Sequence, residues 1–366
     1  LEFRRVLFRS WNGFMVFALL YYAVPKLWKT KLYSVSLANV HFWTATIGIV
    51  LYILSMWASG ITQGLMWRGM EDGRLLYPDF VETVVRIVPL YWVRLLGGIL
   101  YFSGYIVMIW NLAKTIQSAP ASAKEESLVA QPIGVYEPNF NKEGGHRWME
   151  GAVDVFTVFV IIAVLVGSVI EIIPSFTAHK YLEPTSAVTP YSALELAGRD
   201  IYIREGCYTC HSQMVRPIVS ETMRYGAKSE PEESMYDRPF QWGSRRIGPD
   251  LARVGGKYPD LWHYRHMIDP RSMVAGSIMP NYPWLAEKNI DFSVLEKKLK
   301  VLQTLGDPYT QEDVENALAS AKEQARQVAQ NIAAASESSS VDALKKKEIV
   351  ALIAYLQKLK ASKVDE

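Results

Sequence analysis

The distribution of apolar residues divides the chain into two unlike halves. Long apolar runs fill the first half, and the second half is polar and ends in a Lys- and Glu-rich tail. Four runs approach the roughly 20 apolar residues that cross a bilayer, at Trp11–Trp28, His41–Ile61, about Val88–Ala113 and Ala152–Ile173. Buried helices of a large soluble core are the alternative, but runs this long with so few charges favour the membrane. The pattern predicts a mainly α protein with three transmembrane helices plus one anchor, followed by a soluble domain.

The charges of the loops predict the orientation of these helices. Short loops rich in Lys and Arg stay in the cytoplasm. The loop after the first run carries Lys26, Lys29 and Lys31, and the segment between the third and fourth runs is also basic, whereas the loop between the second and third mixes both signs. We therefore expect the chain after about Pro174 to lie outside the cytoplasm.

The apolar runs and the segments between them give the predicted organisation of the whole chain. Residues 1–10, "LEFRRVLFRS", are basic where the first run should begin outside, so we expect a foreign leader. Residues 11–117 hold the first three membrane helices, 118–150 form a cytoplasmic linker, 151–174 hold the anchor, and 175–366 form the soluble domain. A polar, Ala-, Lys- and Glu-rich stretch at about 290–341 is interpreted as a helical insertion on the surface of that domain.

The soluble domain contains both cysteines of the chain in the motif "CYTCH", Cys207 to His211. C-x-x-C-H is the attachment pattern of c-type haem, because two thiols bond the haem and the adjacent imidazole becomes an axial iron ligand. A redox thiol pair would need a βαβ context, and a zinc site would need further nearby ligands. The motif therefore predicts one covalent haem c, with zinc or redox thiols as alternatives. The net charge of +2 indicates no nucleic-acid partner.

The surroundings of the motif are consistent with haem. The segment Ser192–Gly206 has a helical period leading into the motif, and Lys345–Lys360 has the pattern of a C-terminal helix that packs across it, with Tyr355 and Leu356 inward. "IGPDLARVGG" resembles the Gly-Pro-x-Leu segment of small c-type cytochromes, which implies that the Pro249 carbonyl orients His211.

The second axial ligand of the iron must be Met or His. Met279 lies in the Pro-bounded loop "SIMPNYPW", well downstream of the motif, where a chain would cross to the opposite face of the haem. Met214 is too close to the attachment motif to reach that face. We therefore predict Met279 as the sixth ligand, from the candidates Met214, Met223, Met235, Met267, Met273, Met279, His263 and His266.

Several sequence blocks resemble a known family. "REGCYTCHSQMVRP", "ESMYDRPFQWGSRRIGPDLARVGGKY", "HMIDPRS" and "SIMPNYPWL" occur in the order found in the mono-haem cytochrome c subunit (subunit II) of cbb3-type haem–copper cytochrome c oxidases. The first three membrane runs resemble the C-terminal end of the catalytic subunit I of the same oxidases. The resemblance implies a fusion of the two subunits, with Cys207 and Cys210 as thioether sites, His211 and Met279 as axial ligands, and a class I-like cytochrome fold.

The resemblance also implies a function. It implies an oxidoreductase subunit in the bacterial inner membrane whose periplasmic haem c passes electrons from a cytochrome c to a haem–copper centre. Expected partners are the rest of the catalytic subunit, another haem c subunit, a periplasmic cytochrome c donor and membrane lipid. Haem b, haem b3 and copper are expected only in the complete complex, because the membrane runs hold a single histidine, His41. The alternative is a membrane-anchored cytochrome that serves another respiratory complex.

Overall fold

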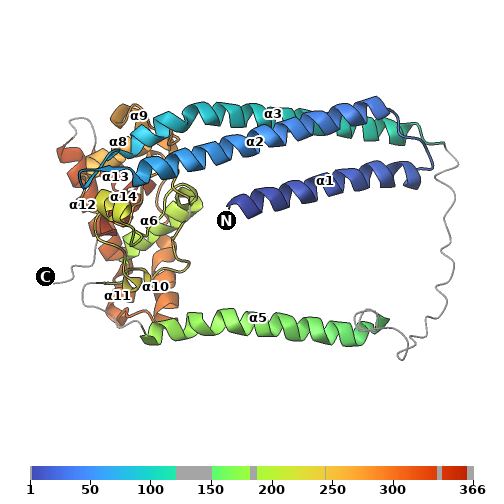
Figure 1. Cartoon of the computed structure of the whole chain (residues 1–366). Coiled ribbons are helices and arrows are strands. Elements are labelled where there is room, and N and C mark those ends of the chain that lie inside the picture. The colour runs from blue at the N-terminus through green and yellow to red at the C-terminus, as the bar shows by residue number, and fades with distance from the viewer. Residues whose placement is uncertain (1, 121–150, 182–187, 244, 336–339, 361–366) are drawn as a thin grey trace. The chain divides into compact units, whose positions relative to one another are not determined.

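The computed structural model describes residues 2–120, 151–181, 188–243, 245–335 and 340–360 (Figure 1). The chain forms two compact units: the first comprises Leu1–Gly64 and Ile87–Ile172, and the second comprises Leu65–Arg86 and Ile173–Glu366. The described secondary structure is helical except for one antiparallel hairpin, β1 (Met70–Glu71) and β2 (Arg74–Leu75), and an isolated antiparallel bridge between Asn289 and Lys347. Most of the predicted linker, residues 121–150, lies outside the described residues.

Four long helices carry the apolar runs: α1 (Glu2–Leu27), α2 (Val35–Arg68), α3 (Phe80–Gln117) and α5 (Val153–Tyr181). Three of them, α2, α3 and the Val153–Ile173 part of α5, are long and apolar enough to cross a membrane. The length and apolar composition of these three helices indicate a membrane protein. The first predicted span, Trp11–Trp28, falls almost entirely within α1, which is not among these three, so its membrane crossing stays a prediction.

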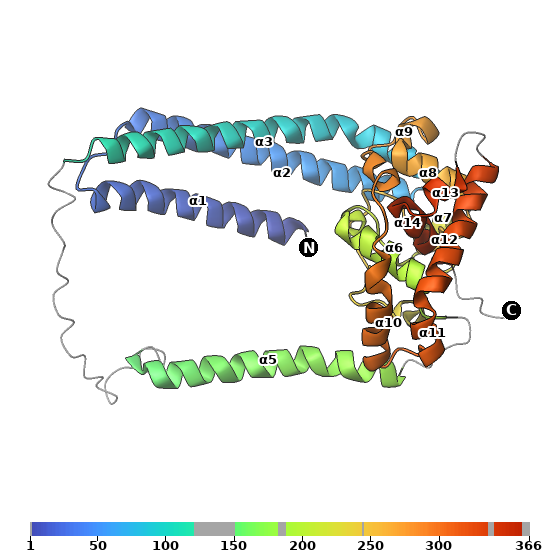
Figure 2. The ribbon, with the colours of Figure 1, turned by 180° about the vertical axis from the view of Figure 1, so that it is seen from behind.

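Helices α2 and α3 pack closely because glycines face each other between them. A Cβ on Gly48 would lie 2.7 Å from the carbonyl oxygen of Gly97, and a Cβ on Gly97 would lie 2.7 Å from that of Gly48. Small residues allow this approach, which is a common way for helices to associate within membranes. Figure 2 shows α1 running beside this pair, and Val24 of α1 packs on Met108 and Leu112 of α3.

The second unit is built from short helices around one apolar core. In chain order its helical elements are α6 (Ala193–Arg204), η2 (Cys207–Thr209), α7 (Val219–Tyr225), η3 (Pro231–Ser234), α8 (Asp260–Ile268), α9 (Pro270–Met273), η4 (Pro283–Ala286), η5 (Phe292–Val294), α10 (Leu295–Thr304), α11 (Gln311–Glu315), α12 (Ala317–Ala334), α13 (Val341–Leu344) and α14 (Glu348–Lys358).

Helices α6 and α14 form the centre of this core. Helix α6 begins with a capping box, in which Ser192 accepts from the Glu195 backbone and the Glu195 side chain accepts from Ser192 N–H. The helices cross at Gly198, where a Cβ would lie 2.0 Å from the Ala351 carbonyl oxygen. Tyr355 is fully buried at this crossing. The predicted packing of the C-terminal helix on the helix before the motif is confirmed.

Helix α12 lies in the stretch at about 290–341 and differs from the expected surface insertion. It contacts α6, α8 and α14, and one of its faces is buried. That face consists largely of alanines four residues apart, with Val328 and Ile332 at one end: Ala317, Ala321, Ala325 and Ala329. Alanine on one face lets a helix approach its neighbours closely, so this segment belongs to the core of the domain. Residues 336–339 of the stretch lie outside the described residues.

Candidate functional site

The two cysteines lie on a tight turn that ends α6. Gly206 terminates the helix with φ 74°, in the left-handed region that glycine adopts without strain. The 3-10 turn Cys207–Thr209 follows, and the backbone N–H groups of Cys210 and His211 donate to the Cys207 carbonyl at 3.2 and 2.9 Å. Both thiols are free. The turn thus places two thiols and an imidazole within five consecutive residues.

The environment of the thiols speaks against a redox pair. Burial raises the pKa of the Cys207 thiol to about 12, whereas redox-active cysteines have a lowered pKa and a reactive thiolate. Among the described residues, no group of three or more His, Cys, Asp or Glu side chains is arranged to hold a metal ion. A site made only of such ligands, as zinc prefers, therefore finds no support in this part of the chain.

His211 is held by the backbone carbonyl of Pro249. The distance from His211 Nδ1 to that oxygen is 2.8 Å. Because a carbonyl can only accept, Nδ1 carries the proton and Nε2 keeps its lone pair. Burial lowers the pKa of His211, which favours the neutral imidazole. The ring is therefore in the tautomer that a metal requires of a histidine ligand.

Gly248 allows the irregular segment that carries Pro249 to pass directly over the His211 imidazole. A Cβ at this position would lie 2.3 Å from His211 Cε1 and 2.8 Å from Nε2. The Gly248 N–H donates to the Cys210 carbonyl at 2.9 Å, which joins this segment to the cysteine turn. Any larger residue would force the imidazole or the segment to move.

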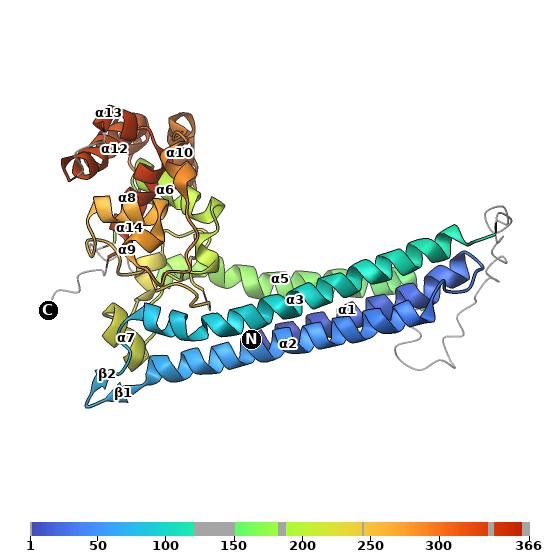
Figure 3. The ribbon, with the colours of Figure 1, turned by 90° about the horizontal axis from the view of Figure 1, so that it is seen from above.

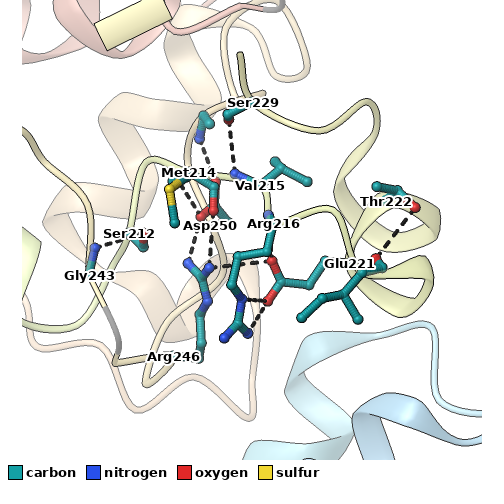
Figure 4. A network of polar contacts seen from close by, with 12 residues as sticks. Ser212, Met214, Val215, Arg216, Glu221, Thr222, Ser229, Gly243, Arg246 and Asp250 are labelled. Atoms are coloured by element: carbon teal, nitrogen blue, oxygen red, sulfur yellow. Dashed lines mark hydrogen bonds and ion pairs between the residues drawn. The ribbon is translucent and has the colours of Figure 1, made fainter. Parts of the chain in front are cut away.

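A largely buried network of charges holds the segment that carries Pro249 against the residues that follow His211 (Figure 4). Asp250 accepts from Arg246 Nη1 at 2.6 Å and from the Met214 N–H at 3.1 Å. Arg246 Nη2 also donates to the Met214 carbonyl at 3.0 Å and lies 3.4 Å from a Glu221 oxygen. Glu221 in turn pairs with Arg216. The network spans residues 214–250 and fixes the residue next to Pro249.

A cavity of about 390 Å³ lies beside His211, in the second unit. Cys207, Cys210, His211, Pro249 and Met279 all line it. The structure therefore brings together every site residue that the sequence predicts. The Met279 N–H donates to Ser277 Oγ at 3.2 Å.

The cavity narrows the choice of a second axial ligand. Of the eight Met and His candidates, Met267, Met279, His263 and His266 line it. Met267 is buried in the core. His263 is also buried, and the Nε2 atom of His263 and the Nδ1 atom of His266 have no hydrogen-bond partner among the described residues. Met279 stays the predicted ligand.

Sequence reasoning assigned no role to Tyr258 or Trp262, and it considered His266 only as a candidate iron ligand. Tyr258, Trp262 and His266 stack in series beside the cavity, with ring centroids 4.0 and 4.5 Å apart. Trp262 and His266 are four residues apart on α8, and Tyr258 lies four residues before Trp262, so this spacing could have revealed a common face. Arg246 and Asp250 are only four residues apart, but their contacts with Met214 and Glu221 join segments distant in sequence and gave no local signal. The same holds for the cavity-lining residues 78–81 and 84.

The donor set fits a c-type haem. The cavity is lined by many apolar side chains and offers two thiols, a neutral imidazole and a thioether. Haem iron takes imidazole and thioether as its axial ligands in cytochromes c. The Gly248 backbone lies close to the His211 imidazole and covers one face of that ring.

Comparison with known proteins defines the class of this chain. A family model described as cytochrome c oxidase, mono-heme subunit/FixO, matches residues 146–362, which is more than half of the chain. The chain therefore belongs to this family of cytochrome c oxidase subunits. A second model, cytochrome c and quinol oxidase polypeptide I, matches residues 6–100.

Curated relatives extend the second match. Residues of this chain are 46% identical over 115 residues to cytochrome c oxidase subunit 1 of Rhodobacter capsulatus, covering 31% of this chain and 22% of that protein. They are 44% identical over 123 residues to the cbb3-type cytochrome c oxidase subunit CcoN1 of Stutzerimonas stutzeri, covering 33% and 26%. The chain spans about a quarter or less of the length of these relatives.

Proposed function

We propose that this chain is the electron-transfer subunit of a cbb3-type terminal oxidase, carrying one covalent haem c. The observation that supports this most directly is the convergence of Cys207, Cys210, His211 and Met279 on one cavity. When bound, haem c supplies a one-electron carrier that shuttles between ferric and ferrous iron. The electrons would come from a periplasmic cytochrome c and serve the haem–copper centre of the complete complex.

The residues of the chain have distinct parts in this proposal. The thiols of Cys207 and Cys210 attach the haem, and His211 Nε2 and Met279 Sδ ligate its iron. The Pro249 carbonyl keeps the proton of the neutral imidazole on His211 Nδ1, so that Nε2 is the nitrogen available to the iron. Cys207 and Cys210 would hold the porphyrin, and His211 together with Met279 would supply both protein ligands of the iron, a ligand set that suits electron transfer and not oxygen binding.

We further propose that the chain joins two oxidase subunits. The order of the family matches supports this, since the polypeptide I match at 6–100 precedes the mono-heme subunit match at 146–362. The anchor α5 lies at the start of the second match, and the cytochrome domain would then lie in the periplasm. Mass spectrometry of the native protein tests the fusion: one polypeptide with peptides from both regions supports it, and two separate polypeptides refute it.

The experiment that tests the electron-transfer role is expression of the full chain with the c-type haem maturation machinery. We expect one haem per chain in a pyridine haemochrome assay, retained in denaturing gels, and reducible by ascorbate. A Cys207→Ala, Cys210→Ala double variant should lose the gel-stable haem. Full haem retention in that variant, or a haem that ascorbate cannot reduce, would refute the proposal.

A second candidate function is a membrane-anchored cytochrome for another respiratory complex. The Val153–Ile173 part of α5 is apolar and has no buried residue within the chain, which would leave it free for other partners. Purification of the native complex discriminates the two. Co-purifying b-type haem, copper and oxygen uptake support the oxidase, and their absence from an intact complex supports the alternative.

A further inference from the structure

The haem cavity has a wall made by the segment that connects α2 to α3. This segment, Leu65–Arg86, belongs to the same compact unit as the cytochrome domain. Five of its residues line the cavity: Pro78, Asp79, Phe80, Val81 and Val84. Figure 3 shows the β1–β2 hairpin of this segment beside α7. One wall of the predicted haem site thus comes from the part of the chain that matches the polypeptide I family.

The segment is held against the domain at two points. Gly276 provides the first, because a Cβ there would lie 2.7 Å from Val81 Cγ1 and 2.9 Å from Val85 Cγ2. Arg224, in the last turn of α7, provides the second. Its Nη2 donates to the Tyr77 carbonyl at 2.7 Å, and its guanidinium lies 6.0 Å from the centre of the Trp67 ring.

Arg224 also lines the cavity. Its Nε is buried, and among the residues that the structure describes it has no hydrogen-bond partner. A buried N–H of a guanidinium without a partner is costly, so a partner is expected when the site is complete. The guanidinium thus has one side engaged with the segment Leu65–Arg86 and one N–H still to be satisfied.

The other charges of the cavity wall are already engaged or solvated. Arg253 makes a two-point ion pair with Glu233, at 2.8 and 2.9 Å. Asp250 is paired with Arg246. Lys257 is exposed and lies over the Tyr258 ring. Asp79 accepts from the Val81 N–H at 3.0 Å. Arg224 is therefore the cation of this wall that is best placed to take an anionic group of a bound ligand.

We propose that the Arg224 guanidinium, which lines the cavity, binds a propionate carboxylate of the haem, while Nη2 holds Tyr77. This proposal rests on the proposed function, since it presupposes haem in the cavity. Haem carries two carboxylates, and a guanidinium matches a carboxylate in geometry and charge. One side chain then ties the edge of the haem to the segment from the polypeptide I part. Arg224 is a binding residue for the haem and a link between the two parts of the chain.

The test uses the full chain with haem incorporated and the variants Arg224→Gln, Arg224→Lys and, as control, Arg253→Gln. We expect Arg224→Gln to shift the propionate bending mode in the resonance Raman spectrum. It should also lower the midpoint potential, because removing a cation near the haem favours the ferric state. Arg224→Lys should retain most of the potential but shift the mode, since the ammonium lacks the guanidinium fork. Arg253→Gln should leave the mode unchanged, because Arg253 is engaged by Glu233.

The outcomes separate this inference from the proposed function. An Arg224→Gln variant with full haem content and an unchanged propionate mode and potential overturns the inference and leaves the proposed function intact. If Arg224→Gln fails to retain haem, Arg224→Lys decides in the same way. A wild-type chain without gel-stable haem refutes the proposed function itself.

Discussion

Two histidines, the half-buried His211 of the second unit and the buried His41 of the first, differ in what holds them. His211 Nδ1 lies 2.8 Å from a backbone carbonyl, in a cavity lined by two thiols and a thioether. His41 is 2% exposed, its Nδ1 lies 3.2 Å from the Tyr21 hydroxyl, and its ring meets Phe17 edge-on at 5.0 Å. The more buried of the two is thus the one without metal-ligating neighbours, so burial cannot by itself identify a ligand.

The partner of Nδ1 distinguishes the two residues. A carbonyl only accepts and fixes one tautomer, whereas a hydroxyl can donate or accept and fixes none. His211 also has thiol and thioether groups on the same cavity, while the ring neighbours of His41 among the described residues are aromatic. A histidine prepared for a metal therefore shows a fixed tautomer together with other donors, and His41 shows neither.

The largest expected effect comes from replacing each of the two histidines, which tests the comparison directly. His211→Ala removes the axial imidazole, so we expect loss of the low-spin haem spectrum and most of the covalent haem. His41→Phe should leave both unchanged, because the ring is surrounded by aromatic side chains. Absorption spectra and haemochrome assays of the two variants measure this. A normal low-spin spectrum in His211→Ala would remove His211 from the site.

The charge network around Asp250 sharpens the comparison, because His41 has no such support among the described residues. Asp250→Asn leaves Arg246 with a weakened partner in the interior, and we expect a loss of about 3 kcal/mol in the free energy of unfolding. The matched control is Asp200→Asn, whose ion pair with Lys298 is about 40% exposed on both sides and should cost less than about 0.5 kcal/mol. Denaturant unfolding of the haem-loaded chain measures both. Equal losses would mean that burial of the network contributes little.

Filling the space above the His211 imidazole should produce a smaller effect than changing Asp250. Gly248→Ala places a methyl group 2.3 Å from His211 Cε1, so the segment that carries Pro249 or the ring must move. Overpacking of this kind costs about 1–3 kcal/mol, and displacement of the axial ring should also change the midpoint potential.

Gly243→Ala is the control for this change. A Cβ on Gly243 would meet its nearest neighbour, the His211 carbonyl oxygen, at 3.6 Å, which is ordinary contact. We expect a redox titration to leave this variant at the wild-type potential. A normal potential in Gly248→Ala as well would show that the segment that carries Pro249, not the imidazole, absorbs the clash.

The parts of the site that were predictable from sequence are those with a local pattern. The spacing of Cys207, Cys210 and His211, the Pro-bounded loop of Met279 and the apolar period of α14 are all visible in short windows. The contacts of Arg246 and Asp250 with Met214 and Glu221, and the wall from Leu65–Arg86, join segments far apart in the chain, for which a single sequence carries no periodic signal.

The burial of α12 was not predictable for a different reason. Its buried face is alanine, which is only weakly apolar, and its other faces are rich in Lys, Glu, Gln and Arg. A solvated helix and a helix that packs closely through alanines therefore have nearly the same pattern. What decides between them is the shape of the partner surface formed by α6, α8 and α14.

A third histidine, the buried His263, gives the smallest expected effect and extends the comparison to acid pH. Burial lowers its pKa from 6.5 to about 4. Between these values the unfolded chain binds more protons than the folded one, so stability falls as the pH falls. This group should cost about 1 kcal/mol between pH 6.5 and 5.5, and unfolding of wild type and His263→Phe at both pH values measures it. The His263→Phe variant should lose this part of the change of unfolding free energy with pH, whatever its absolute stability. An unchanged slope would mean that His263 is already protonated in the folded chain, or that it lies in contact with water.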